Sequence, residues 1–248
     1  MNDHAEQYVR FLADTVARLV EVQAQAVQAT ATVFADAIEA AGRVHVYDTG
    51  HMVGHELVAR TGGFLAFTRL EFAAHTTAGG LGRPEPPSPS DPGEATAALV
   101  GWLFTQNTIR PGDALLVSSV SGVSAQVVEL ALTARERGVP VVALTSVEFS
   151  SRLPAKHRRG RRLFEVADVV LDNLAPYGDA TQQLPGLAEP VCPLSGVTGA
   201  ALLWAIVAQT ASVLVDRGVK PSVYPSINLP DGPARVAAIE NHYLSTGQ

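Results

Sequence analysis

The chain has 248 residues, of which 47% are hydrophobic and 17% are charged, and its formal net charge at pH 7 is −6. This composition supports a folded core and excludes a charge-rich disordered protein. The acidic balance argues against surface-wide attraction to nucleic acid or anionic lipid, and the single cysteine, Cys192, excludes a disulfide framework or a cysteine-rich zinc module. Residues 1–4, Met-Asn-Asp-His, do not begin a secretory signal, so we expect a cytoplasmic protein.

The expected elements begin with an amphipathic helix over residues 3–41, where apolar side chains recur at helical spacing without Pro or Gly. Apolar strands then alternate with helical patterns. The expected strands span 43–47, 69–73, 113–118, 139–145 and 164–171, and the expected helices span 51–64, 94–106, 123–137, 195–217 and a last segment from about 231. This alternation is typical of an α/β protein with a parallel, doubly wound sheet covered on both faces. Ligands of such sheets bind at the carboxyl ends of the strands.

The uncharged stretch over residues 191–215 could be a membrane span or a buried helix. A span needs about 20 predominantly apolar residues, and the run over 199–215 approaches that length. Thr198, Gln209 and Thr210 interrupt the stretch, and no second span or cationic flank accompanies it. We therefore expect no membrane partner and a helix buried between the sheet and a partner subunit.

The serine loop, residues 119–124, follows the expected strand over 113–118 and reads Ser-Val-Ser-Gly-Val-Ser. Three hydroxyl groups, a glycine that allows close backbone approach and a following helix N-terminus predict an anion-binding loop, for which phosphate is the natural ligand. The alternative is an ordinary serine-rich turn in which Ser121 or Ser124 caps the helix.

Two common nucleotide-binding motifs are excluded. The serine loop lacks the Gly-Lys-[Ser/Thr] end of a Walker loop, and residues 48–50, Asp-Thr-Gly, are not a Gly-x-Gly-x-x-Gly dinucleotide fingerprint. An ATPase or a dehydrogenase is therefore disfavoured.

The segments around these loops resemble a known domain family. The serine loop, followed after one helix by Gly-Val-Pro-Val-Val-Ala-Leu-Thr at 138–145, resembles the second half of a sugar isomerase (SIS) domain. The N-terminal helical segment leading into Arg-Val-His-Val-Tyr-Asp-Thr-Gly-His at 43–51 resembles its first half. Residues 167–173, Ala-Asp-Val-Val-Leu-Asp-Asn, with Pro-Tyr-Gly-Asp-Ala at 176–180, resemble a subgroup with one SIS domain per chain. The resemblance covers nearly the whole chain.

The resemblance implies a flavodoxin-like five-stranded sheet of the α/β class. It divides the chain into an N-terminal helical segment over 1–42, a SIS domain over 43–217 and a C-terminal loop and helix over 218–248 that pack on the same domain. It also implies a homodimer or homotetramer built on helices.

A sugar phosphate is the ligand that the resemblance implies, with its phosphate on the serine loop. The candidate binding residues are Asp48, Thr49, Gly50, Ser119, Ser121, Gly122, Ser124 and Asp179. The first loop departs from the family's Gly-x-Gly-x-Ser pattern, because Asp48 replaces the first glycine and Met52 replaces the serine. An aspartate there repels a phosphate dianion but accepts hydrogen bonds from sugar hydroxyls.

Isomerisation of an aldose to a ketose through an enediol needs a base that moves a proton between neighbouring carbons. Glu56 is the preferred candidate, with His51 and His75 as further catalytic candidates at the carboxyl edge of the expected sheet. The alternatives are that Glu56 only stabilises a helix N-terminus, that His75 is structural, and that Asp179 forms an Asx turn.

His51 and His55 are four residues apart on the expected helix, a spacing at which two imidazoles can bind a divalent metal such as zinc. His75 is the candidate third ligand. The main expectation is that no cofactor is bound, in which case His51 caps the turn and His55 packs in a subunit contact.

A basic segment, residues 151–164, carries six cationic side chains and no acidic one. They are Arg152, Lys156, Arg158, Arg159, Arg161 and Arg162. The rest of the chain has 12 basic and 24 acidic residues. The segment fits either a solvated loop or a mobile flap that attracts an anionic substrate. Because no aromatic residue interleaves these cations before Phe164, no nucleic-acid partner is expected.

The sequence thus predicts a phosphosugar-binding protein, with aldose–ketose isomerisation as the expected reaction. Two alternatives remain open. One is a non-catalytic module that binds a sugar phosphate, which needs the serine loop but no acid/base pair, and the other is an aminosugar-phosphate deaminase or lyase.

Overall fold

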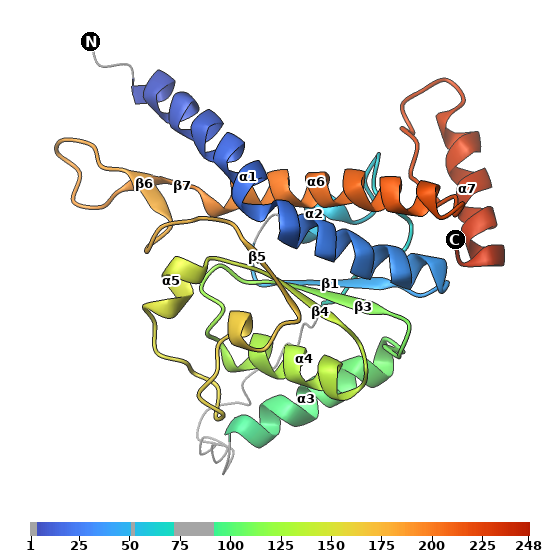
Figure 1. Ribbon diagram of the computed structural model, residues 1–248, viewed down its shortest axis with the longest axis horizontal. Coiled ribbons are helices and arrows are strands. Elements are labelled where there is room, and N and C mark those ends of the chain that lie inside the picture. The colour runs from blue at the N-terminus through green and yellow to red at the C-terminus, as the bar shows by residue number, and fades with distance from the viewer. Residues whose placement is uncertain (1–3, 51–52, 72–91) are drawn as a thin grey trace, which may run out of the picture.

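A computed structural model describes residues 4–50, 53–71 and 92–248 (Figure 1). Its centre is a parallel sheet of five strands in the order β2-β1-β3-β4-β5. The strands are β1 (Val44–Asp48), β2 (Phe67–Arg69), β3 (Ala114–Ser118), β4 (Val141–Thr145) and β5 (Val169–Asp172). This is the flavodoxin-like, doubly wound order, and it confirms the predicted fold class.

The register brings the carboxyl ends of the strands to one edge of the sheet. β1 pairs with β3 from Val44 opposite Ala114 to Asp48 opposite Ser118, and β4 pairs with β5 up to Thr145 opposite Asp172. The loops that follow these four strands therefore lie side by side.

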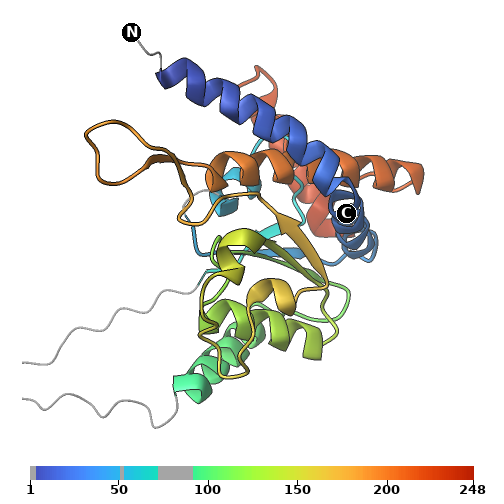
Figure 2. The ribbon, with the colours of Figure 1, turned by 60° about the vertical axis from the view of Figure 1, so that its left-hand side comes forward.

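Helices cover both faces of the sheet (Figures 1 and 2). On one face lie α1 (His4–Glu39) and α6 (Ser195–Asp216), with the short α2 (Val53–Leu57) next to α6. On the other face lie α3 (Pro92–Gln106) and α4 (Ala125–Glu136). The N-terminal part of α1 extends beyond the sheet in both views.

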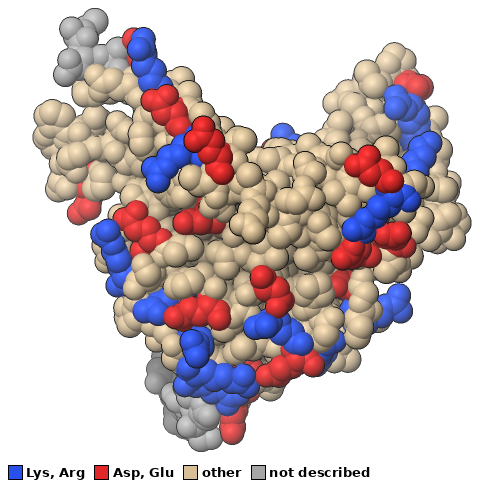
Figure 3. All heavy atoms as spheres, in the orientation of Figure 1, with Lys and Arg blue, Asp and Glu red and all other residues tan. Residues whose placement is uncertain are grey.

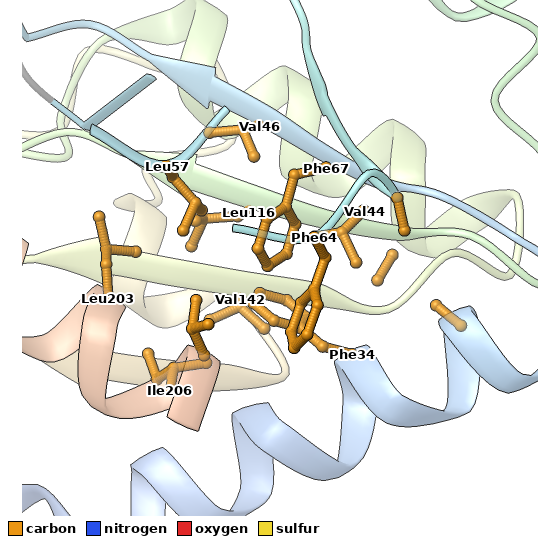
Figure 4. Close-up of a cluster of buried hydrophobic side chains, with 14 of the residues drawn as sticks. Phe34, Val44, Val46, Leu57, Phe64, Phe67, Leu116, Val142, Leu203 and Ile206 are labelled. Carbon is orange, nitrogen blue, oxygen red and sulfur yellow. The ribbon is translucent and has the colours of Figure 1, made fainter. Parts of the chain in front are cut away.

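The central strands β3 and β4 are almost entirely apolar because each of their faces contacts a helical layer. In β3, Leu116 belongs to the cluster under α1 and α6, whereas Leu115 belongs to the cluster under α3 and α4. Figure 4 shows the first cluster, in which Phe34 of α1 and Ile206 of α6 meet the sheet. Burial of each side chain of this size stabilises the folded state by about 1.5–3 kcal/mol relative to leaving it exposed to water.

The uncharged segment forms α6, which packs along α1 over the sheet and buries Leu202, Leu203 and Ile206. Among the described residues, α6 is the one helix whose length and mean hydropathy of 1.7 would allow it to cross a membrane. Its contacts are those of a helix that closes the core of an α/β domain.

The helix predicted over 51–64 is longer than the helix in the structure. α2 ends at Leu57, and Ala59 takes a left-handed conformation with φ 54°. Phe64, which the prediction placed at the helix end, instead pairs with Val223 of the C-terminal segment. β2 begins two residues before the predicted strand and ends at Arg69, while residues 72–73 of that prediction lie outside the described residues.

The strand predicted over 164–171 is also shorter than expected. A 3-10 turn, η1 (Leu163–Glu165), precedes it, because Glu165 accepts the amide N–H of Arg162 at 2.7 Å. Leu163 and Val166 are buried in the cluster under α3 and α4, so their apolar character reflects a packed turn.

Three further elements surround the carboxyl edge of the sheet. α5 (Val147–Ser151) follows β4, and an antiparallel hairpin of β6 (Ala180–Gln182) and β7 (Val191–Pro193) leads into α6. This hairpin is not among the elements expected from the sequence. The last helix, α7 (Gly232–Thr246), begins next to the predicted residue 231.

Candidate functional site

A cavity of about 550 Å³ opens at the carboxyl edge of the sheet. The segments that line it follow β1, β3, β4 and β5 or begin α6. The lining residues are Asp48, Thr49, Gly50, Ser118, Ser119, Val120, Ser121, Leu144, Phe149, Asn173, Asp179, Pro193, Ser195, Gly196 and Val197. Six of the eight predicted binding residues are in this set, and Gly122 and Ser124 are not.

The serine loop turns its carbonyl groups away from the cavity and into the protein. The carbonyl of Val120 accepts the amide N–H of Ser146 and the hydroxyl of Thr145, both at 3.0 Å. The carbonyl of Gly122 accepts the N–H of Leu163 at 2.8 Å. Three hydrogen bonds, from Thr145, Ser146 and Leu163, thus fix the path of the loop on the side away from the cavity.

Four of the six amide groups of the serine loop are unpaired in the described structure, whereas that of Ser119 donates to the carbonyl of Leu144 at 3.0 Å and that of Gly122 to the hydroxyl of Ser119 at 3.3 Å. No residue in the described ranges accepts a hydrogen bond from the N–H of Val120, Ser121, Val123 or Ser124. Ser124 is the N-cap residue of α4 and its side chain makes no capping hydrogen bond, so the first amides of that helix lack a side-chain partner as well. Free amides before a helix N-terminus favour an anion.

Gly122 is required by this conformation. Its φ is +57°, and a Cβ atom would lie 2.9 Å from Oγ1 of Thr145 and 3.2 Å from Cβ of Leu163. Gly122 is buried and shapes the loop from behind, which explains why it does not line the cavity.

The loop after β1 is organised by Asp48. Its carboxylate accepts the amide N–H of Gly50 at 2.9 Å and that of Gly54 at 3.3 Å. Thr49 donates both its amide and its hydroxyl to the carbonyl of Ser118, at 3.0 and 3.2 Å. The residue that departs from the family pattern therefore holds the backbone of its own loop.

Asp179 holds the start of α6. Its carboxylate accepts the amide N–H groups of Leu194 and Ser195, at 3.0 and 2.8 Å, and the hydroxyl of Ser195 at 2.6 Å. A carboxylate at a helix N-terminus satisfies free amides and complements the helix dipole. Asp179 lines the cavity, but these contacts give it a structural role whether or not a ligand binds.

Comparison with known proteins identifies the family. The model of the SIS domain matches residues 7–146. The chain belongs to the SIS-domain family. A UPF0309 protein from Streptomyces coelicolor is 32% identical over 94% of this chain and 92% of its own length. A UPF0309 protein from Brucella canis is 37% identical over 89% of each chain.

A solved structure shares the SIS fold. A phosphoheptose isomerase from Neisseria gonorrhoeae aligns with 85% of this chain and 98% of its own, with a TM-score of 0.50 and 17% sequence identity. At this identity the likeness concerns the fold.

Glu56, the predicted base of the SIS domain, does not line the cavity. Its Oε1 accepts the indole N–H of Trp204 at 2.9 Å and its Oε2 accepts the guanidinium of Arg60 at 2.8 Å. The contact with Trp204 joins α2 to α6, and the contact with Arg60 is local. The other two predicted catalytic residues, His51 and His75, lie outside the described residues, so all three catalytic assignments stay predictions.

The predicted metal pair is likewise open, because His51 lies outside the described residues. His55 is exposed and lines a small hollow of about 60 Å³ that also contains Asp48, Arg69 and Glu71. Within the described ranges no three His, Cys, Asp or Glu side chains are arranged to hold a metal ion.

The basic segment supports the serine loop from the side away from the cavity. Lys156 donates its amide to the carbonyl of Val123 at 3.1 Å, and the buried imidazole of His157 lies 2.6 Å from the carboxylate of Glu129 on α4. Several of its arginines face acidic partners, for example Arg159 with Glu136 at 3.2 Å. Figure 3 shows positive and negative side chains interspersed over this face of the molecule.

Sequence reasoning missed several residues of the cavity wall, notably Phe149, Asn173 and Ser195. Asn173 directly follows β5, so its place at the carboxyl edge could have been inferred from the strand pattern. Ser195 and Phe149 gave no comparable signal, because α5 and the hairpin before α6 position them.

Proposed function

We propose that the protein binds a sugar phosphate in the 550 Å³ cavity, with the phosphate on the serine loop. The observation that carries this proposal is the set of free amide groups at Val120 and Ser121 beside the hydroxyls of Ser119 and Ser121. A phosphate dianion is the ligand that such a set of donors favours.

The described part of the cavity wall has no Lys, Arg or His side chain. Backbone amides and hydroxyls of Ser119, Val120 and Ser121 would therefore bind the phosphate, as neutral donors do in other anion-binding loops. The remaining wall combines apolar Leu144, Phe149 and Val197 with a few polar groups, which suits the carbon chain and hydroxyls of a sugar.

The reaction we propose is aldose–ketose isomerisation through an enediol. Membership of the SIS family supports it, and the fold is shared with a phosphoheptose isomerase. In this reaction a base removes the proton at C2 of the aldose and returns it to C1, while a second group moves a proton between the two oxygens. Glu56, His51 and His75 are the candidates for these roles.

The rival is a module that binds the same ligand without turning it over. One observation favours it: in the described cavity wall the carboxylates are those of Asp48 and Asp179, and both accept hydrogen bonds from backbone amides. An aminosugar-phosphate deaminase or lyase would use the same binding site with a different assignment of the carboxylates.

Calorimetric titration tests the binding proposal. Pentose, hexose and heptose phosphates are titrated into the protein beside the same sugars without phosphate. We expect saturable binding of at least one phosphorylated sugar and none of its unphosphorylated form. Equal binding of the two forms, or binding of neither, would contradict the proposal.

The same proposal includes self-association, with a second copy of the chain as the partner. A groove of about 440 Å³ between α1 and α6 is lined by Val16, Val20, Ala201, Ala205 and their neighbours. The projecting part of α1 carries exposed apolar side chains of its own. One helix of this kind matches the groove on another copy, so both apolar surfaces would be covered.

A further inference from the structure

Asn173 is a buried polar residue of the cavity wall with no role in the assignments above. It directly follows β5, lines the cavity and is 2% exposed. Its backbone N–H donates to the carbonyl of Thr145 at 2.9 Å, which fixes the residue against the end of β4.

The side-chain amide of Asn173 has a hydrogen-bond partner at its oxygen but not at its nitrogen in the described structure. Its Oδ1 accepts the N–H of Ala175 at 3.0 Å, which settles which side-chain atom is oxygen and orients the amide plane. In the described structure Nδ2 donates to no residue, and it is not among the side-chain atoms that are fully enclosed without a partner. The two N–H bonds of Nδ2 are therefore available to the cavity.

An unused donor on a buried side chain is costly unless something accepts its hydrogen bonds. A buried polar group without a partner costs about 1–3 kcal/mol. Water can accept these hydrogen bonds before a ligand binds, and a ligand oxygen can accept them afterwards. Because the amide plane is already fixed, little conformational entropy is lost when a ligand accepts this hydrogen bond.

The position of Asn173 says which part of a ligand it meets. The serine loop starts at the end of β3 and reaches β4, where the carbonyl of Val120 accepts the hydroxyl of Thr145. β5 is the next strand, so Asn173 lines the cavity about one strand spacing, roughly 5 Å, further on. A sugar phosphate whose phosphate is held by Ser119 and Ser121 can extend its carbon chain toward Asn173.

We propose that Asn173 is a specificity-determining residue of the site, which donates a hydrogen bond to a sugar oxygen remote from the phosphate. This proposal rests on the proposed function, since it assumes a sugar phosphate with its phosphate on the serine loop. It adds that the protein distinguishes a sugar phosphate from inorganic phosphate through the β5 side of the cavity. An amide donor accepts no proton from the ligand, so its effect is on binding and selectivity.

Asn173→Asp is the sharpest test. Aspartate keeps the oxygen that accepts the N–H of Ala175, and it replaces the donor group by a second oxygen and adds a negative charge to the cavity. The dissociation constants for inorganic phosphate and for the sugar phosphate that binds the wild type most tightly are measured by calorimetry. We expect a 10- to 100-fold loss of affinity for the sugar phosphate and a smaller loss for inorganic phosphate, which is repelled by the added charge but does not use the lost donor.

Two further variants complete the design. Asn173→Ser removes the amide but keeps a hydroxyl that can accept the N–H of Ala175, so it replaces Asn173→Asp if that variant does not fold. Asn107→Asp is the matched control, because Asn107 donates to Leu103 on α3 and does not line this cavity. It is expected to leave both affinities unchanged.

The outcomes separate the two proposals. If the wild type binds sugar phosphates and Asn173→Asp binds them unchanged, or loses both ligands equally, the assignment of Asn173 is wrong while the proposed function stands. If the wild type binds no sugar phosphate, the proposed function fails and the assignment of Asn173 fails with it.

Discussion

The indole nitrogen of Trp204 donates a hydrogen bond of 2.9 Å to Oε1 of Glu56, across the contact between α6 and α2. Arg60 occupies the other carboxylate oxygen at 2.8 Å. The carboxylate is thus a link between two helices, and a base at this position must exchange one of these partners for the substrate. This makes Glu56 the residue at which the isomerase and the binding module differ most clearly.

Replacement of Glu56 by glutamine tests the isomerase. If Glu56 is the base, Glu56→Gln abolishes deuterium exchange at C2 of the bound sugar phosphate in D2O and leaves its dissociation constant within threefold, because the binding residues are elsewhere. Exchange is followed by NMR. Trp204→Phe is the control, since it removes a partner of the carboxylate but keeps the base. Unchanged exchange in Glu56→Gln would assign the base to another residue, and no exchange in the wild type would favour the binding module.

A methyl group on Gly122 is expected to destabilise the protein strongly. Gly122→Ala combines a φ of +57° with a Cβ atom 2.9 Å from Oγ1 of Thr145, for a total cost of about 2–5 kcal/mol in the free energy of unfolding. Denaturant titration measures this. The size of the loss follows from the close fit of the loop against β4.

Two other glycines separate the contributions at Gly122. Gly160 has a φ of +63° with open space around it, so Gly160→Ala reports the backbone cost alone, about 1–2 kcal/mol. Gly101 lies within α3 with nothing near its Cβ position, and Gly101→Ala should stabilise the protein by about 0.5–1 kcal/mol. A Gly122→Ala variant no less stable than Gly160→Ala would mean that the serine loop is not packed as described.

The stability of the protein is expected to fall below about pH 6.5 because of His45. Burial lowers the pKa of His45 below its ordinary value, and the nearby Arg43 lowers it further, while the hydrogen bond and charge of Asp113 oppose the shift. Nε2 lies 3.2 Å from Oδ2 of Asp113, and Nδ1 has no partner in the described structure. Protonation would therefore place an unpaired N–H in the core.

The sign of the pH effect follows from proton counts. Between the ordinary pKa of about 6.5 and the lower folded pKa, the unfolded chain binds the proton and the folded chain does not, so the free energy of unfolding falls as the pH falls, by up to about 1.4 kcal/mol per pH unit. Urea titrations from pH 7.5 to 5 measure how the free energy of unfolding depends on pH. The contribution of His45 to this dependence should be absent in His45→Gln, and an identical dependence in the variant would exclude His45 as the cause.

Self-association is expected to depend on the groove between α1 and α6. Val20 is 67% exposed on α1 and lines the groove, so Val20→Glu places a charge in the proposed contact and should shift a dimer toward monomer. Val215 on α6 is 66% exposed and does not line the groove, which makes Val215→Glu a matched control. Analytical ultracentrifugation reads the result, and a wild type that is monomeric at every concentration tested would contradict the proposal.

The sheet could be predicted because parallel strands buried on both faces must be apolar. The strands at 114–118 and 141–145 were therefore located nearly to the residue. The hairpin before α6 could not, because each of its strands has three residues and Cys192 and Asp179 take left-handed conformations that no local pattern announces. Phe64 was assigned to a helix because its pairing with Val223 is a contact between distant segments.

The site was predictable to a similar extent. The serine loop follows from its composition and its place between a strand and a helix, and the structure puts Ser119 and Ser121 in the cavity wall. The sequence does not tell that Asp179 and Asp48 are engaged by backbone amides, because those partners come from turns whose geometry depends on the assembled sheet edge. From the sequence, Asp48 is expected to accept hydrogen bonds from sugar hydroxyls, and Asp179 is expected either to bind the ligand or to form an Asx turn.

The serine loop carries the central claim, and Ser121 tests it most directly, because its hydroxyl makes no hydrogen bond in the described structure and the residue lines the cavity. Calorimetric titration of the best-bound sugar phosphate into Ser121→Ala should show a 10- to 100-fold weaker affinity, since a hydrogen bond to a charged group contributes about 1.5–3 kcal/mol. Ser245→Ala on α7, whose hydroxyl donates to the carbonyl of His242 and which does not line the cavity, should bind as the wild type does. Full affinity in Ser121→Ala would contradict the assignment of the phosphate to this loop.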